Sequence, residues 1–201
     1  MEFQHRTTFR RGHRPPTRLA LLPGTFNPPT VAHIALAEAA QHLVDEVVFV
    51  LPEHLPHKHH FGATFAERVD LLKAAGHQAS IATTRGGLYI EIAREFRAHF
   101  GSETHICLLC GRDAAERILT WDYGREGVVQ EMLAEFEFLV APRKGEFDPP
   151  ADWEHRMKKL DLNARMDEIS STDLRDRIAR GEAWEHLVPG AIVDRVRKIY
   201  S

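Results

Sequence analysis

The segment that most constrains the fold of this chain is Leu19–His33, which has the sequence Leu-Ala-Leu-Leu-Pro-Gly-Thr-Phe-Asn-Pro-Pro-Thr-Val-Ala-His. A short apolar run ends at a glycine turn, a proline pair follows, and a helix begins with Thr30 and His33 in its first turn. The free N–H groups and the positive dipole at the start of such a helix bind anions. Thr30 and His33 are three residues apart, so their hydroxyl and imidazole are expected to reach one phosphate.

A second anion-binding pattern lies near the other end, in Ile169–Arg175, with the sequence Ile-Ser-Ser-Thr-Asp-Leu-Arg. Ser171 or Thr172 is expected to cap a helix that ends near Gly181. The guanidinium of Arg175 suits this position because its planar fork pairs with two phosphate oxygens at once. The chain thus carries two candidate phosphate-binding segments, far apart in sequence.

Apolar runs that favour strands alternate with helical stretches along the chain. The predicted strands are Arg18–Leu22, Glu46–Leu51, Ser80–Thr84, Thr104–Leu109 and Glu137–Ala141. The predicted helices are Pro29–Leu43, Phe65–Ala75, Gly87–His99, Ala114–Ile118, Val128–Glu135, Thr172–Ala179 and Pro189–Tyr200. Near-continuous apolar strands indicate a parallel sheet buried on both faces, and the alternation predicts a doubly wound α/β fold. Ligands of such sheets bind at the carboxyl ends of the strands, where the strand order reverses.

Composition narrows the class of protein. A length of 201 residues, with 43% hydrophobic and 27% charged residues, is typical of one globular domain. The net charge of −3 gives no attraction to nucleic acid or to an acidic membrane, and we expect neither as a partner. The two cysteines, no signal peptide and no apolar run of membrane-spanning length predict a cytoplasmic location.

The first 17 residues differ in composition from the rest, since they are basic, contain two prolines and hold little apolar material. We predict a flexible basic N-terminal arm over residues 1–17, followed by a single domain over residues 18–201. The arm is either a contact for an acidic partner or a simple extension.

The two segments resemble the marks of the nucleotidylyltransferase superfamily, a (His/Thr)-x-Gly-His turn and a distal Ile-Ser-Ser-Thr-x-x-Arg. More narrowly, the chain resembles bacterial nicotinate-mononucleotide adenylyltransferases over nearly all of residues 18–201. The matching stretches are Gly24–Pro29, Pro52–Lys58, Glu67–Arg68, Gly111–Asp113, Trp121, Val140–Arg143, Ile169–Arg175 and Leu187–Tyr200.

This resemblance implies a Rossmann-like nucleotidylyltransferase fold and transfer of AMP from ATP to the 5′-phosphate of nicotinate mononucleotide, in NAD biosynthesis. The partners it implies are small molecules, ATP as co-substrate and a mononucleotide. Mg²⁺ is expected to arrive with ATP rather than in a resident site. The four histidines His54, His57, His59 and His60 show no regular ligand spacing, so we predict no bound metal there.

The resemblance also implies roles for individual residues. The catalytic residues are His33, Thr30, Lys58 and Arg175, with His33 stabilising charge rather than removing a proton. The ATP-binding residues are Gly24, Thr25, Phe26, His33, Gly111, Asp113, Ile169, Ser170, Ser171, Thr172 and Arg175. The acceptor-binding residues are Asn27, Lys58, Arg85, Tyr89 and Trp121.

Alternatives remain open for several of these positions. Asp113 can also be a helix N-cap, and Trp121 a core residue. Cys107 and Cys110 lie an odd number of residues apart on a predicted strand, so we expect them to point to opposite faces of the sheet as core residues.

The sequence constrains the identity of the acceptor less than it constrains the ATP site. The Ser-Tyr-Thr run of nicotinate-specific relatives is absent from Thr84–Ile90, so nicotinamide mononucleotide and phosphopantetheine remain alternative acceptors. A nucleotide-binding protein without turnover is a third hypothesis. The sequence is also compatible with a homo-oligomer.

Overall fold

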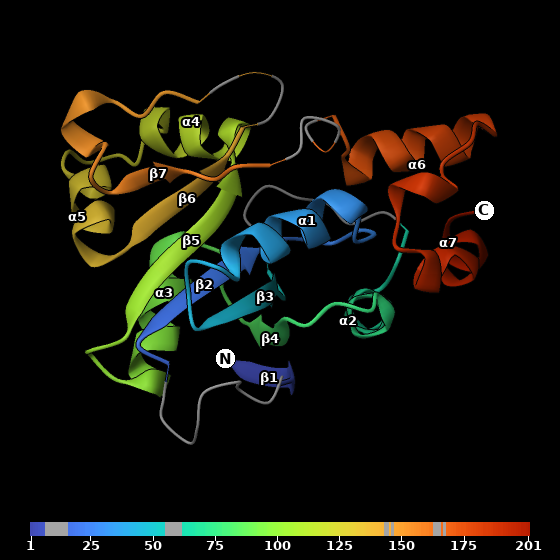
Figure 1. Cartoon of the computed structure of the whole chain (residues 1–201), viewed down its shortest axis with the longest axis horizontal. Helices are drawn as coiled ribbons and strands as arrows, with labels where there is room; N and C mark the ends of the chain where they lie inside the picture. The colour runs from blue at the N-terminus through green and yellow to red at the C-terminus, as the bar shows by residue number, and fades with distance from the viewer. Residues whose placement is uncertain (7–15, 55–61, 143–144, 146, 163–165, 167) are drawn as a thin grey trace.

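Parallel strands form the centre of the molecule, and the strand order reverses between two of them (Figure 1). The computed structural model describes residues 1–6, 16–54, 62–142, 145, 147–162, 166 and 168–201. Within these residues a seven-stranded sheet has the order β1-β4-β3-β2-β5-β6-β7. The strands are β1 (Glu2–His5), β2 (Arg18–Pro23), β3 (Glu46–Pro52), β4 (Ser80–Thr84), β5 (His105–Gly111), β6 (Glu137–Ala141) and β7 (Met157–Lys159).

Helices cover both faces of this sheet. The α-helices are α1 (Val31–Ala40), α2 (Phe65–Ala74), α3 (Tyr89–Phe100), α4 (Arg112–Thr120), α5 (Val128–Glu135), α6 (Ser171–Arg180) and α7 (Val193–Tyr200). Short 3₁₀ turns lie at Ala151–Trp153, Glu185–Leu187 and Gly190–Ile192. Helices α3, α4 and α5 pack on one face of the sheet, and α1 and α2 contribute to the core on the other. The strands therefore carry buried residues on both sides, as their continuous apolar sequences predict.

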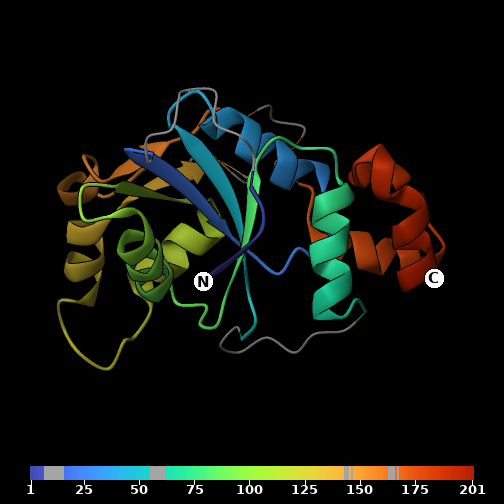
Figure 2. The same cartoon turned by 90° about the horizontal axis from the view of Figure 1, so that it is seen from below.

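A third core joins the C-terminal helices to α2. Leu71 of α2, Leu174 of α6 and Val196 of α7 belong to one buried cluster. Figures 1 and 2 both show α6 and α7 beside α2 at one end of the molecule, away from α5. This packing brings the distal motif back toward the loop that follows β2.

The structure confirms the doubly wound α/β prediction and its five parallel strands. Strand β2 is central, with β3 on one side and β5 on the other. The odd spacing of the two cysteines has the expected result, because Cys107 lies in the core beside α1 and Cys110 in the core beside α3. Both thiols are buried and unpaired.

Two edge strands were not predicted. Glu2–His5 forms β1, which pairs antiparallel with β4, so these residues belong to the sheet and not to an arm. The ring of Phe3 packs against Phe96 and Phe100, and the terminal amino group lies 2.8 Å from the Glu95 carboxylate. Phe3 is the one apolar residue of Glu2–His5, so the sequence of this stretch did not predict a strand. Residues 7–15 of the expected arm lie outside the described residues.

At the opposite edge, the three-residue strand β7 pairs with β6. It was missed because two of its three residues are exposed lysines, Lys158 and Lys159. No helix in the described part of the chain is both long and apolar enough to cross a membrane.

Candidate active site

A cleft of about 670 Å³ opens at the carboxyl edge of the sheet, where the strand order reverses between β2 and β5. Pro23 at the end of β2 and Gly111 at the end of β5 both line it. Its volume is in the range of clefts that bind nucleotide-sized ligands. The predicted site residues that line this cleft are Gly24, Thr25, Asn27, His33, Tyr89, Gly111, Asp113, Ile169, Ser170, Ser171, Thr172 and Arg175.

The loop after β2 is tightly packed against its own aromatic residue. Phe26 is fully buried and has a φ of 45°, an uncommon conformation for a residue with a side chain. A Cβ atom on Gly24 would lie 2.9 Å from the Phe26 ring, so a larger residue at position 24 would force this ring to move. Glycine is therefore needed here for a close approach inside the loop.

The two distant motifs meet at this loop. Arg175 Nη1 donates to the backbone oxygen of Asn27 over 2.5 Å, and Ser171 Oγ donates to the backbone oxygen of Pro28 over 2.8 Å. The hydroxyl of Tyr200 in α7 donates to Asn27 Oδ1. These contacts bring the two candidate phosphate-binding segments together at one loop.

His33 is oriented by the N-cap of its own helix. The Thr30 backbone N–H donates to His33 Nδ1 over 3.0 Å, and the Thr30 hydroxyl lies 2.7 Å from the same nitrogen. A backbone N–H can only donate, so Nδ1 must accept, and the ring proton of the neutral imidazole lies on Nε2. His33 thus offers a hydrogen-bond donor, and no acceptor for a proton, from a ring that lines the cleft.

Thr30 has a different place from the one we predicted. Its side chain is fully buried and does not line the cleft, so its hydroxyl cannot be the phosphate ligand that we expected from the spacing. The hydroxyl instead contacts His33. The two contacts from Thr30 to Nδ1 orient the ring of His33.

The start of α6 lies at the cleft, where Ser170, Ser171 and Thr172 are all lining residues. The N-cap is Ser170, whose Oγ accepts from the Asp173 N–H over 3.0 Å, and not Ser171 or Thr172 as predicted. Ser171 donates to Pro28 instead, which leaves the cap to its neighbour. The first turn of α6 therefore lies beside the cleft. The N–H groups of such a turn have no acceptor within the helix.

Several predicted residues lie elsewhere. Phe26 is buried beneath the loop, with its ring 5.1 Å from that of His33, so it supports the site without lining it. Arg85 is exposed and does not line the cleft as the structure describes it. Trp121 follows α4 with 49% of its surface exposed and is not a core residue. Lys58 lies outside the described residues.

The structure excludes the N-cap alternative for Asp113. Helix α4 begins at Arg112 with Gly111 as its N-cap, so Asp113 lies in the first turn and does not cap the helix. Its side chain is exposed at the cleft. Arg117, one turn further along α4, lines the same cleft and was not predicted, although its i+4 spacing from Asp113 was a usable signal.

Two other contributors escaped prediction because their contacts are long-range. Arg68 of α2 is 2% exposed and donates from Nη1 to the backbone oxygen of Thr25 over 3.0 Å. Burial lowers the pKa of Arg68. Burial also raises the pKa of Tyr200 to about 12, so its hydroxyl keeps its proton and stays a donor to Asn27 at neutral pH.

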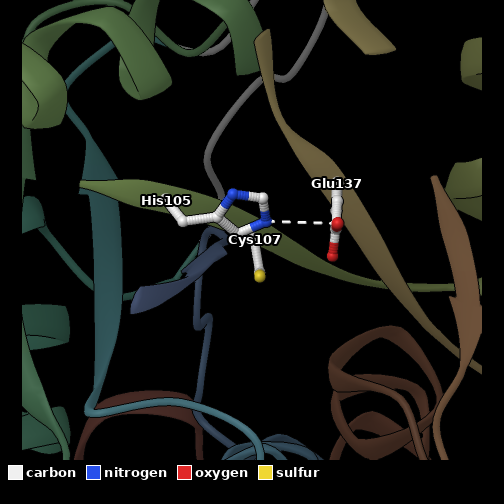
Figure 3. Close-up of side chains that lie close together, drawn as sticks. All are labelled: His105, Cys107 and Glu137. Carbon is white, nitrogen blue, oxygen red and sulfur yellow. Dashed lines mark ion pairs between the residues drawn. The ribbon is translucent and has the colours of Figure 1, made fainter. Parts of the chain in front are cut away.

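A second group of potential ligands lies at the amino ends of β5 and β6 (Figure 3). The donor atoms of His105, Cys107 and Glu137 lie within 4.8 Å of one another. However, the Glu137 carboxylate already pairs with Arg18 at 2.9 Å and with Lys158 at 3.4 Å. Burial raises the pKa of Cys107 to about 11, which keeps the thiol neutral. We therefore interpret this group as an ion-pair network that joins β2, β5, β6 and β7.

The chain is similar to known proteins over most of its length. A family model described as cytidylyltransferase-like matches residues 21–177. A Bordetella pertussis protein named "Probable nicotinate-nucleotide adenylyltransferase" is 32% identical, with 86% of this chain and 91% of the relative covered. A protein of the same name from Moorella thermoacetica is 29% identical, with 90% of each chain covered.

Solved structures share the fold at low identity. The nicotinic acid mononucleotide adenylyltransferase of Plasmodium falciparum, complexed with NaAD, matches with a TM-score of 0.69 and 14% identity. The match covers 92% of this chain and 96% of that protein. The similarity in fold therefore extends over nearly the whole chain.

Proposed function

The chain belongs to the cytidylyltransferase-like family, and from that premise we propose that it transfers AMP from ATP to the 5′-phosphate of nicotinate mononucleotide. Pyrophosphate is the second product, and the dinucleotide formed is a precursor of NAD. The names of the B. pertussis and M. thermoacetica relatives support this reaction and this acceptor. The free cysteines support a cytoplasmic location.

The observation that carries the proposal is the meeting of His33, the start of α6 and Arg175 at one cleft. These groups supply an N–H donor, helix N-terminal amides and a guanidinium, which together suit a chain of phosphates. All of them come from one chain, so the proposed site needs no second copy.

Adenylyl transfer requires alignment and charge stabilisation more than covalent help from the protein. An oxygen of the acceptor phosphate attacks the α-phosphorus of ATP, and the bond from that phosphorus to the bridging oxygen of pyrophosphate breaks. The attacking phosphate is already an anion, so no general base is needed. This fits His33, whose Nδ1 is occupied by Thr30 and whose Nε2 carries the proton.

In this mechanism His33 donates from Nε2 to an α-phosphate oxygen, where negative charge builds during the reaction. Arg175 and the first turn of α6 bind the β- and γ-phosphates that leave as pyrophosphate. Mg²⁺ enters as part of the Mg-ATP co-substrate. Gly24, Thr25, Gly111, Asp113 and Ile169–Thr172 complete the ATP site, in the proposal, from around the cleft.

The acceptor occupies the remaining side of the cleft. We assign Asn27 and Tyr89 to it because both line the cleft. Lys58, Arg85 and Trp121 stay in the proposal from the family resemblance. Arg85 and Trp121 would have to approach the acceptor from outside the described cleft.

The direct test is turnover. Purified protein with Mg-ATP is offered nicotinate mononucleotide, nicotinamide mononucleotide and phosphopantetheine in turn, and pyrophosphate release is measured. The proposal expects the highest kcat/KM with nicotinate mononucleotide. Preference for another acceptor would refute the assigned substrate, and ATP binding without pyrophosphate release from any acceptor would refute the enzyme assignment.

A further inference from the structure

Arg117 is a cationic side chain in the cleft that the family motifs do not include. It lies in α4, four residues after Asp113, and both residues line the cleft. In a helix, residues at this spacing share one face. Arg117 is therefore directed to the same space as Asp113, at the carboxyl end of β5.

The cleft crosses from one face of the sheet to the other. His33 belongs to α1, which packs with the core on one face, whereas Arg117 belongs to α4, which packs with α3 and α5 on the opposite face. Figure 1 shows α4 and α6 on either side of the tip of β5. The hydrogen-bond donors of the cleft thus form two groups, the neutral ring of His33 with the guanidinium of Arg175 on one side and the guanidinium of Arg117 on the other.

Arg117 also differs from Arg175 in its contacts. Arg175 donates to the Asn27 backbone oxygen and lies 3.4 Å from the Thr172 hydroxyl. Among the described residues, Arg117 makes no ion pair and no hydrogen bond. The nearby acidic residue Glu116 pairs with Arg112 instead.

The surroundings of Arg117 suit an apolar ring that carries a negative group. Tyr89 lines the cleft beside it, and the Tyr89 ring packs at 5.9 Å on Phe138 in the core. Burial raises the pKa of Tyr89, and the charge of Arg117 acts against this shift. A neutral phenol next to a guanidinium can contact a planar ring while the guanidinium pairs with a carboxylate.

We propose that Arg117 binds the ring carboxylate of the acceptor and thereby selects a nicotinate over a nicotinamide mononucleotide. The inference rests on the proposed function. An acceptor with two anionic ends needs positive charge at both. Its phosphate must lie near His33 and the α-phosphorus, which leaves its ring end for the α3 and α4 side, where Arg117 is the cation that lines the cleft in the described structure.

The planar guanidinium of arginine can distinguish a carboxylate from a carboxamide. A carboxylate accepts two parallel N–H bonds from a guanidinium, whereas a carboxamide offers one acceptor and places its own NH₂ donors against the other N–H groups. Lysine at this position would keep the charge and lose the paired geometry.

The test compares Arg117→Ala and Arg117→Lys with the unmodified protein, using both mononucleotides as acceptors. For Arg117→Ala we expect kcat/KM for nicotinate mononucleotide to fall by roughly 10- to 100-fold, with little change for nicotinamide mononucleotide or in the KM for ATP. Arg117→Lys should lower kcat/KM for nicotinate mononucleotide by a smaller factor, because the charge is kept. Arg125→Ala is the control, because Arg125 is exposed and pairs with Glu131 outside the cleft.

Direct binding titrations of both mononucleotides separate this inference from the proposed function. If the unmodified protein releases no pyrophosphate but binds the nicotinate form selectively, the proposed function fails, and loss of that selectivity in Arg117→Ala still supports the inference. The inference is overturned if Arg117→Ala loses affinity equally for both mononucleotides, or loses none. It is also overturned if Arg85→Ala, rather than Arg117→Ala, removes the selectivity, or if neither mononucleotide binds.

Discussion

On the α1 and α6 side of the cleft, three helices donate hydrogen bonds to one loop, whereas the described residues on the α3 and α4 side form no comparable network. Arg68, Ser171, Arg175 and Tyr200 all bond to oxygens of residues 25–28. On the other side, the cleft-lining side chains of Asp113 and Arg117 have no hydrogen-bond partner among the described residues. The loop of residues 25–28 is therefore held by side chains from three helices, whereas Asp113 and Arg117 remain available to a ligand.

This difference fits the two substrates of the proposed reaction. The phosphates of ATP must be held in one alignment for in-line attack, which favours a preorganised network. The acceptor side carries the choice between similar mononucleotides, which depends on a few polar contacts. Substitutions on the first side should therefore affect ATP and catalysis, and those on the second should affect the choice of acceptor.

The largest expected effect comes from His33→Ala. Removing the Nε2–H donor should lower kcat by on the order of 100-fold or more, because a preorganised donor to developing charge typically contributes that much. Pyrophosphate release measures the effect. His42→Ala, an exposed histidine just beyond α1, is the matched control. Turnover at the unmodified rate in His33→Ala would remove this residue from the mechanism.

Arg175→Ala should have the next largest effect. We expect the KM for ATP to rise roughly 10- to 100-fold, with a much smaller change for the acceptor, since charge-assisted bonds to the phosphates are lost. Arg180→Ala on the same helix, an exposed residue paired with Glu182, should change neither constant. An equal loss for both substrates would contradict the separation of the two sides.

Gly24→Ala tests the packing of the loop itself. The added Cβ meets the buried Phe26 ring at 2.9 Å, so we expect the free energy of unfolding to fall by about 1–3 kcal/mol, as for overpacked cores. Thermal or denaturant unfolding gives the value. Gly190→Ala has open space around its Cβ and should be nearly neutral. Equal stability of the two variants would show that the loop is not closely packed.

Tyr200→Phe should give the smallest effect. It leaves Asn27 Oδ1 without the phenol donor and should cost about 1 kcal/mol of unfolding free energy, with a few-fold rise in the KM for ATP. Tyr123→Phe loses a similar bond, to the Ile118 backbone oxygen, at the end of α4. If Tyr123→Phe raised the KM for ATP as much, the effect of Tyr200 would not be specific to the loop.

The sequence predicted the central sheet well because local pattern and burial agree there. Every residue of β3 and β4 is buried, and the continuous apolar run Val47–Leu51 of β3 allowed few other interpretations. It failed at the edges, where β1 and β7 are short and polar and depend on a neighbouring strand for their hydrogen bonds. Pairing with a strand that is distant in the sequence cannot be predicted from the local pattern of apolar and polar residues.

The site shows the same limit. Glycine, histidine and the Ile169–Arg175 motif indicated the cleft because backbone geometry and phosphate chemistry require particular residue types there. The role of Thr30 was missed because spacing shows a shared face but not which side chain is buried. Arg68 and Tyr200 lie 43 and 173 residues from the loop residues that they bond, and no local pattern reports such contacts.

The central claim is that residues 24–33 and 169–175 bind a single triphosphate, and a crystal structure with a non-hydrolysable ATP analogue tests it most directly. The account predicts the triphosphate between His33 Nε2 and the first turn of α6, with Arg175 in contact with its phosphate oxygens. A triphosphate bound elsewhere, or touching only one of the two segments, would contradict the account.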